Sequence, residues 1–213
     1  MAFEIELKAW VSRKNPQNKD AAERAGAVLS SLGRYGGEYR KSDTYWRGQL
    51  PFSIRVRREE RVFCRQKTGI TLVTYKIKKR DGGIEINDER EFEIAGRNGE
   101  SAAEGFEYLL ERLGMAKTEV KTKQGRVWDC GGINAELSLV CGKNDRPLGW
   151  FIELEIIAKD DSAKTRAKAK TRLLELLAKT GIDPENSEDR YYTELLREQA
   201  VHLQTGKNSI PLD

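Results

Sequence analysis

The residues of this chain best suited to chemistry are acids and bases that alternate with apolar residues. The stretch EIELK at residues 4–8 is the first example, and its alternation predicts a β-strand with one apolar face and one charged face. Later stretches repeat the pattern, and within most of them the charges share one sign. Because side chains two residues apart share one face of a strand, each stretch presents a ladder of like charges.

Two kinds of ligand suit such ladders. Glutamate clusters hold hard divalent cations such as Mg²⁺ or Mn²⁺ through oxygen. Arginine and lysine clusters hold phosphate oxygens. A single ladder is more typical of the wet face of an antiparallel sheet. The grouping of like charges within each strand favours a binding site, because like charges on one face repel each other and a bound ligand of opposite charge compensates that repulsion. A metal polyphosphate would satisfy both kinds of ladder at once.

The elements that must position these ladders are strands with helices between them. Strand patterns fill most of residues 41–94 and return at 118–129, 133–140 and 149–157, and Gly36 and Gly37 predict a turn. Helical periodicity and capping residues predict helices over 20–33, 101–114, 160–181 and 187–200. The pattern predicts an α+β fold, mainly antiparallel β, in which a closed eight-stranded β-barrel turns its charged faces inwards and carries helices outside.

Composition narrows the class of protein. The 213 residues include one histidine and three cysteines, which excludes histidine triads and multi-histidine metal sites and fits a reducing compartment. No stretch approaches the length of a membrane span, so we expect a cytoplasmic protein without membrane contact. A net charge of +4 without a basic block makes nucleic acid an unfavoured partner. The oligomeric state is left open, a homodimer included. We expect one domain over residues 1–199 and a C-terminal tail over 200–213.

The EIELK stretch resembles the Glu-x-Glu-x-Lys signature of the CYTH proteins, within the triphosphate tunnel metalloenzymes. Further stretches resemble that family's segments in the same order: SDTYW, IRVR, TYKIK, EREFE, VKTKQGR, LGWFIELE and RYYTELL. The resemblance spans about Phe3 to Leu196. It implies an antiparallel barrel that is open at both ends, with helices outside, a triphosphate substrate, and Mg²⁺ or Mn²⁺ as cofactor.

The resemblance and the ladders together assign roles to residues. The expected metal ligands are Glu4, Glu6, Glu91, Glu93, Glu136, Glu153 and Glu155. The expected triphosphate-binding residues are Lys8, Arg55, Arg57, Lys76, Lys78, Lys121, Lys123 and Arg126. The expected catalytic residues are Glu4, Glu6, Lys8, Arg55 and Arg57. Two departures from the family are visible. Glu136 and Ser138 stand where the family often has an aspartate, and Gly125 interrupts the alternation, so that Arg126 points inwards only if a bulge lies there.

The expected function is metal-dependent hydrolysis of a triphosphate, with inorganic triphosphate, thiamine triphosphate and nucleoside triphosphates as candidate substrates. One alternative is a class IV adenylate cyclase, which converts ATP to cyclic AMP and pyrophosphate. That reaction needs a base-stacking residue, for which Tyr45, Trp46 and Trp128 are candidates. Another alternative is a non-catalytic polyphosphate-binding module.

Overall fold

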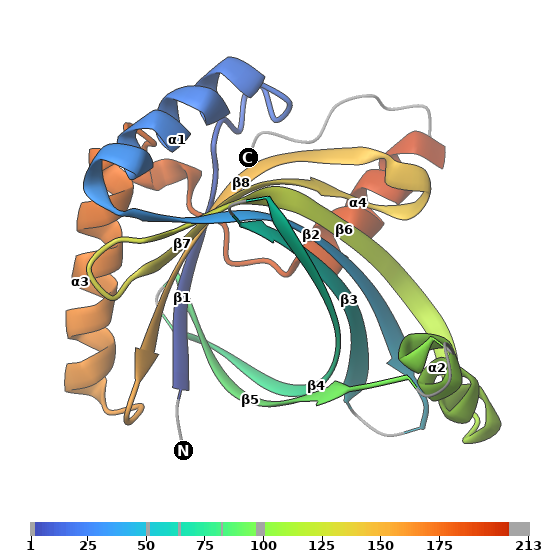
Figure 1. Cartoon of the computed structure of the whole chain (residues 1–213). Coiled ribbons are helices and arrows are strands. Elements are labelled where there is room, and N and C mark those ends of the chain that lie inside the picture. Colours follow the sequence, from blue (N-terminus) through green and yellow to red (C-terminus); the bar gives the residue numbers. More distant parts are fainter. Residues whose placement is uncertain (1–2, 50–51, 64, 82, 97–100, 205–213) are drawn as a thin grey trace.

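The computed structural model describes residues 3–49, 52–63, 65–81, 83–96 and 101–204, except for the side chains of residues 76–81, 85–89, 203 and 204. It consists of one curled sheet with helices around it (Figure 1). The strands are β1 (Phe3–Trp10), β2 (Arg34–Arg47), β3 (Ser53–Phe63), β4 (Gln66–Asp81), β5 (Ile84–Ile94), β6 (Ala116–Asp129), β7 (Asn134–Cys141) and β8 (Pro147–Ala158). The α-helices are α1 (Lys19–Leu32), α2 (Ala102–Arg112), α3 (Ala163–Lys179) and α4 (Tyr192–Gln204), and two 3₁₀ turns are η1 (Lys143–Asp145) and η2 (Pro184–Asn186).

All strand pairs are antiparallel, in the order β1-β5-β4-β3-β2-β6-β7-β8, and β1 also pairs with β8. The β1–β8 ladder runs from Phe3 to Trp10, whereas the β1–β5 ladder joins only Glu4, Ile5 and Glu6 to their partners. The expected antiparallel eight-stranded sheet is confirmed, with α1, α2 and α3 outside it as expected. Helix α4 differs, because it packs on inner-face residues of β1 and β8. A tunnel that is open at both ends stays a prediction.

Helices α1, α2 and α3 pack on the outer face of the sheet because that face carries the apolar half of each alternation. Residues of β1 such as Ile5 and Leu7 are buried in a core with Leu29 of α1 and Leu173 of α3. A smaller core joins α2 to the outer faces of β2 and β3.

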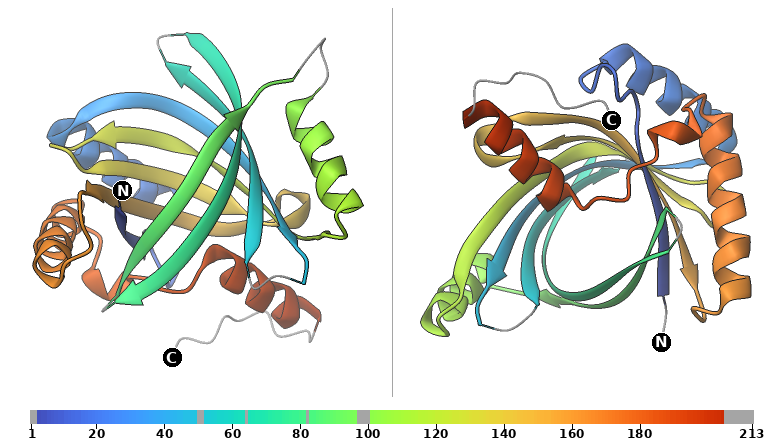
Figure 2. Two further views of the ribbon diagram at one scale, coloured as in Figure 1. Left: turned by 90° about the horizontal axis from the view of Figure 1, so that it is seen from below. Right: turned by 180° about the vertical axis from the view of Figure 1, so that it is seen from behind.

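Figure 2 shows α4 away from α1, α2 and α3, and it contacts β6 and β8. Tyr192 of α4 packs with Trp10 and Phe151, which lie on the inner face of β1 and β8, so α4 covers part of the inner face. Among the described residues, no helix is long and apolar enough to cross a membrane.

The four helices confirm the predicted ones within a few residues at each end. Ser101 caps α2 by accepting a hydrogen bond from the backbone N–H of Glu104, as the capping pattern predicts. The turn predicted at Gly36 and Gly37 is wrong, because β2 already begins at Arg34 and passes through both glycines. A register shift lies between Tyr35 and Gly37 in the β2–β6 ladder. Helix α4 continues to Gln204, so it extends into the segment expected to be a tail.

Candidate functional site

A cavity of about 260 Å³ lies against the inner face of the sheet. Its described lining is charged or polar except for Leu72. The lining residues are Glu4, Glu6, Lys41, Arg55, Arg57, Glu59, Arg61, Leu72, Glu91, Lys123, Asn134, Glu136, Glu153 and Glu155. Most acids come from β7, β8, β1 and β5, which are consecutive in the strand order, and the bases come from β3, β2 and β6, which are also consecutive. The cavity therefore has an acidic wall and a basic wall.

Asp43 organises the basic wall from beneath. It is fully buried and accepts two hydrogen bonds from the guanidinium of Arg57, at 2.7 and 3.0 Å. The ammonium nitrogen of Lys121 lies 3.1 Å from Oδ2 of the same carboxylate, the oxygen that also accepts the longer hydrogen bond from Arg57. Burial alone would raise the pKa of Asp43, but the charges of Arg57 and Lys121 outweigh it and hold that pKa well below its ordinary value of 3.8. Asp43 is thus a fixed anion that orients two cations.

A second network joins the basic wall to the acidic wall. Glu136 accepts hydrogen bonds from Tyr39 at 2.8 Å, Lys41 at 2.5 Å and Lys123 at 3.0 Å. Lys123 also lies 2.6 Å from an oxygen of Glu153. Burial would raise the pKa of Glu153, and Lys123 lowers it to about 2, while burial would lower the pKa of Lys123 and the two glutamates raise it well above 10.5. Glu136, Glu153 and Lys123 are therefore charged near neutral pH.

Two further contacts fix side chains of β3. Arg55 donates to the hydroxyl of Thr74 at 2.9 Å and to a carboxylate oxygen of Glu91 at 3.0 Å. Glu59, which is buried, accepts a hydrogen bond from Arg61 two residues further along the same face. The arginines of β3 are thereby held in place before any ligand arrives.

The structure brings most of the predicted site residues together. Those that line the cavity are Glu4, Glu6, Arg55, Arg57, Glu91, Lys123, Glu136, Glu153 and Glu155. Lys8 and Lys121 are buried next to it, since Lys8 is the cross-strand partner of Glu153 and Lys121 binds Asp43. Glu93 is exposed and lies outside the described lining. The side chains of Lys76 and Lys78 lie outside the described residues.

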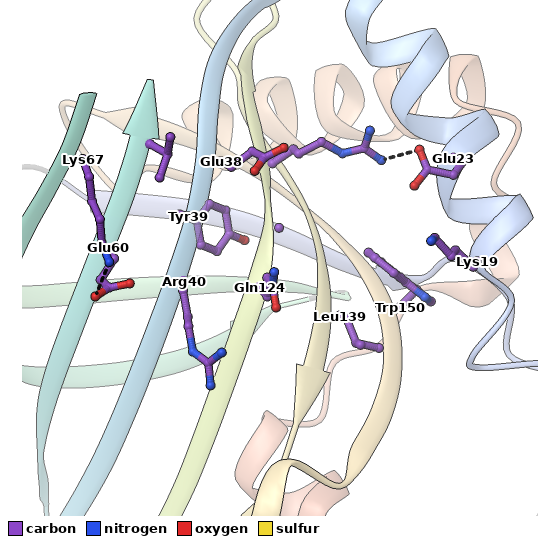
Figure 3. Close-up of a pocket in the computed structure, with 13 residues that line it drawn as sticks. Lys19, Glu23, Glu38, Tyr39, Arg40, Glu60, Lys67, Gln124, Leu139 and Trp150 are labelled. Atoms are coloured by element: carbon purple, nitrogen blue, oxygen red, sulfur yellow. Dashed lines mark hydrogen bonds and ion pairs between the residues drawn. The ribbon is translucent and has the colours of Figure 1, made fainter. Parts of the chain in front are cut away.

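Arg126 is a correction, because it lies on the outer face of the sheet. Register passes through Gly125 and Arg126 without a shift, so that Arg126 shares a face with Leu137 of β7. Its guanidinium lies 2.9 Å from a carboxylate oxygen of Glu23 on α1. Both residues line a groove, in which Figure 3 labels Glu23. Gly125 serves close strand packing and not a bulge, since a Cβ there would lie 2.3 Å from the carbonyl oxygen of Leu137.

Two of the three residues considered for base stacking also lie outside the barrel interior. Trp46 belongs to the apolar core beneath α2. Trp128 belongs to the core beneath α1, where its indole N–H donates to the hydroxyl of Ser30 at 3.0 Å. The cavity lining therefore contains no tryptophan among its described residues.

Carboxylate oxygens are the donors that Mg²⁺ and Mn²⁺ prefer, so the acidic wall fits these ions by its chemistry. Glu6 and Glu155 are direct cross-strand partners, and both line the cavity, so their carboxylates could share one cation. Within the described part of the chain, however, no three His, Cys, Asp or Glu side chains already form a metal-binding group. Several of these acids face lysines or arginines instead, as Glu136 and Glu153 do.

Sequence reasoning did not predict the contributions of one strand face and of one helix to the site. Tyr39, Lys41 and Asp43 share the inner face of β2, and alternation through Tyr45 was the signal that could have revealed it. Tyr192 of α4 reaches the charged network, where its hydroxyl donates to Glu153 at 2.6 Å. A helical pattern carries no sign of that contact.

Comparison with known protein families gives no match, and no curated protein matches the chain. Solved structures do match. The PH1819 protein from Pyrococcus horikoshii OT3 superposes with a TM-score of 0.71 at 23% identity, over 92% of this chain and 99% of that one. A candidate adenylate cyclase from Vibrio parahaemolyticus gives a TM-score of 0.66 at 19% identity, over 92% and 98%. A chain of the Mediator head module from Schizosaccharomyces pombe gives 0.55 at 12% identity, over 83% and 93%.

These likenesses concern the fold. The chain shares with these solved structures the fold of an antiparallel eight-stranded sheet with helices packed on it, as the sequence predicts. One similar structure is called a candidate adenylate cyclase and another is part of the Mediator head module, so the fold alone does not fix a reaction.

Proposed function

We propose that this protein is a divalent-metal-dependent hydrolase of inorganic triphosphate or of another small triphosphate, which binds in the interior cavity. The observation that carries the proposal is the division of that cavity into an acidic wall and a basic wall. A metal-bound phosphate chain presents cations and anions side by side. The acidic wall would contact the cations and the basic wall would contact the phosphates. Pure anion binding would gain nothing from the acidic wall, which makes a non-catalytic polyphosphate-binding module the weaker reading.

The size of the cavity favours a small substrate. Pockets that enclose drug-sized ligands have volumes of roughly 300–1,000 Å³, whereas this cavity has about 260 Å³. Its described lining has one apolar residue, Leu72, and no aromatic ring that could stack on a nucleobase. A phosphate chain therefore fits the interior better than a whole nucleoside triphosphate does, and this favours hydrolysis of a small triphosphate over cyclisation of ATP.

The basic wall would bind the phosphates and stabilise the charge that develops during phosphoryl transfer. Arg57 and Lys121 are held by Asp43, and Arg55 is held by Thr74 and Glu91, so little reorganisation is needed when the substrate arrives. A carboxylate with a pKa near 2 accepts protons poorly at neutral pH, so Glu153 would hold cations and would not act as the general base.

Glu4, Glu6, Glu153 and Glu155 would hold Mg²⁺ or Mn²⁺, with Glu91 and Glu136 near them. When bound, such an ion neutralises phosphate charge and lowers the pKa of a coordinated water. The Glu6–Glu155 pair is the strongest candidate, because these cross-strand partners both line the cavity and could share one cation.

The test is a product assay with inorganic triphosphate, thiamine triphosphate and ATP, each with Mg²⁺ and with Mn²⁺. We expect phosphate release from at least one triphosphate, and at least about 100-fold lower kcat/KM in Glu6→Gln and Glu155→Gln proteins. Glu23→Gln, on the outer face, is the matched control and should behave as wild type. Cyclic AMP and pyrophosphate from ATP would identify a cyclase instead. Full activity in both inner-face variants would show that the site is misassigned.

A further inference from the structure

Tyr192 comes from outside the sheet, yet it reaches the buried charges of the inner face. It is the first residue of α4, and it is buried. Its ring centroid lies 4.9 Å from the ammonium nitrogens of Lys8 and Lys121 and 5.8 Å from that of Lys123. These lysines come from β1 and β6, strands that are not neighbours in the sheet. One aromatic ring is therefore the common neighbour of three buried cations.

The three lysines are almost completely removed from water, with exposed fractions of 3% for Lys8, 4% for Lys121 and 3% for Lys123. A desolvated ammonium group needs compensating contacts, and a cation–π contact is stronger in such a place than at an exposed site. Asp43 provides one partner for Lys121, and Glu136 and Glu153 provide partners for Lys123. The ring of Tyr192 adds a contact that all three share.

The hydroxyl group makes a separate contact. It donates a hydrogen bond of 2.6 Å to a carboxylate oxygen of Glu153. The edge-on contact of the ring with Phe151, at 4.9 Å between centroids, and the neighbouring Trp10 and Leu195 fix the ring from its apolar side. Tyr192 is thus held by an apolar cluster on one side and contacts both lysines and a carboxylate on the other.

We propose that Tyr192 is a positioning residue of the interior cavity, whose ring places phosphate-binding lysines and whose hydroxyl places the metal-binding carboxylate of Glu153. The inference rests on the proposed function for its consequences in binding, but the placement of the lysines can be tested without any substrate. Docking of α4 is then part of the assembly of the site and not only of the fold.

Two substitutions separate the two contacts. Tyr192→Phe keeps the ring and removes the hydroxyl, so it should leave the affinity for inorganic triphosphate, measured by calorimetry without metal, within about threefold of wild type. It should weaken Mn²⁺ binding about tenfold, as loss of a partner behind a metal ligand does. Tyr192→Leu keeps an apolar side chain in the cluster that holds α4 but removes the aromatic ring. Because the lysines then lose their cation–π contact, triphosphate binding should weaken at least about tenfold.

Leu195→Ala is the matched control for loosening of α4, since Leu195 packs in the same apolar cluster and has neither an aromatic ring nor a hydroxyl. It should lower the melting temperature and leave both affinities unchanged. If Leu195→Ala weakens triphosphate binding as much as Tyr192→Leu does, Tyr192 acts only through the docking of α4 and the proposal fails.

Amine labelling followed by mass spectrometry tests the placement without substrate. Tyr192→Leu should raise the labelling rates of Lys8 and Lys121 several-fold. Lys41, whose ammonium lies 4.4 Å from the ring of Tyr39, is the internal control and should keep its rate. Unchanged labelling of Lys8 and Lys121 would overturn the proposal. If wild-type protein binds no triphosphate but the labelling changes as expected, the proposed function fails and the role of Tyr192 stands.

Discussion

Lys123 and Arg126 lie three residues apart on β6, and each forms an ion pair on a different face of the sheet. Lys123 is 3% exposed on the inner face, with Glu136 at 3.0 Å and Glu153 at 2.6 Å. Arg126 is 28% exposed on the outer face, with Glu23 at 2.9 Å, and Glu23 is itself 50% exposed. The distances are nearly equal, but the surroundings are not.

In this fold, burial and not distance therefore determines how strongly an ion pair is coupled to its surroundings. Exposed pairs contribute little because water and salt screen them. Buried charges are costly unless every partner is present, so a buried network is strongly coupled to each of its members. The outer pair helps to fasten α1 to the sheet, whereas the inner network maintains charges that a ligand could use.

The largest expected effect comes from removing the inner cation. Lys123→Met leaves Glu136 and Glu153 without their shared partner, and breaking such a buried network costs about 3–5 kcal/mol. We expect this loss in the unfolding free energy from urea titration, and loss of binding to inorganic triphosphate by calorimetry. A variant that keeps wild-type stability would show that the inner network is as well hydrated as the outer pair.

The inner faces of most strands could be predicted because a strand has a strict period of two. Glu4, Glu6, Arg55, Arg57 and the Glu153–Glu155 pair all line the cavity as the alternation predicts. Their grouping into an acidic and a basic wall depends on which strands are neighbours in the sheet. That order comes from the pairing of residues far apart in sequence and cannot be read from any single strand.

The errors also have physical reasons. Arg126 was misplaced because Gly125 is compatible with both a bulge and close strand packing, and only the nearby carbonyl of Leu137 distinguishes the two. Trp46 has an aromatic ring that could stack on a base, but α2 covers it. The position at which a helix packs on a strand cannot be predicted from the pattern of that strand. Tyr192 was missed because its partners lie on strands far from it in sequence.

An intermediate effect is expected from the pH dependence of the unfolding free energy, to which the inner-face residue Glu153 contributes. The pKa of Glu153 in the folded protein is about 2, below its ordinary value of 4.5, so the folded state binds this proton less readily than the unfolded state does. Its stabilising contribution is present above about pH 4.5 and is lost as pH falls towards 2. The unfolding free energy of wild type should therefore fall relative to that of Glu153→Gln, by on the order of 3 kcal/mol across this window.

Urea titrations of both proteins at several pH values between 6 and 2 measure this difference. The plots of unfolding free energy against pH for wild type and Glu153→Gln should run parallel above pH 5 and converge below it. Parallel curves throughout would mean that Glu153 titrates in the folded protein as it does in the unfolded chain, and would remove it from the inner network.

The smallest expected effect lies on the outer face. Arg126→Gln breaks a partly exposed pair, and such pairs contribute at most about 1 kcal/mol. The unfolding free energy should fall by no more than that, and less in 0.5–1 M salt, because salt screens the pair. Since Arg126 lies on the opposite face from the cavity, triphosphate affinity and kcat/KM should match those of wild type. A large loss of triphosphate binding in this variant, with stability unchanged, would mean that Arg126 reaches the ligand after all. That result would require a register for β6 in which Gly125 bulges, and the contrast between the two faces of this strand would fail.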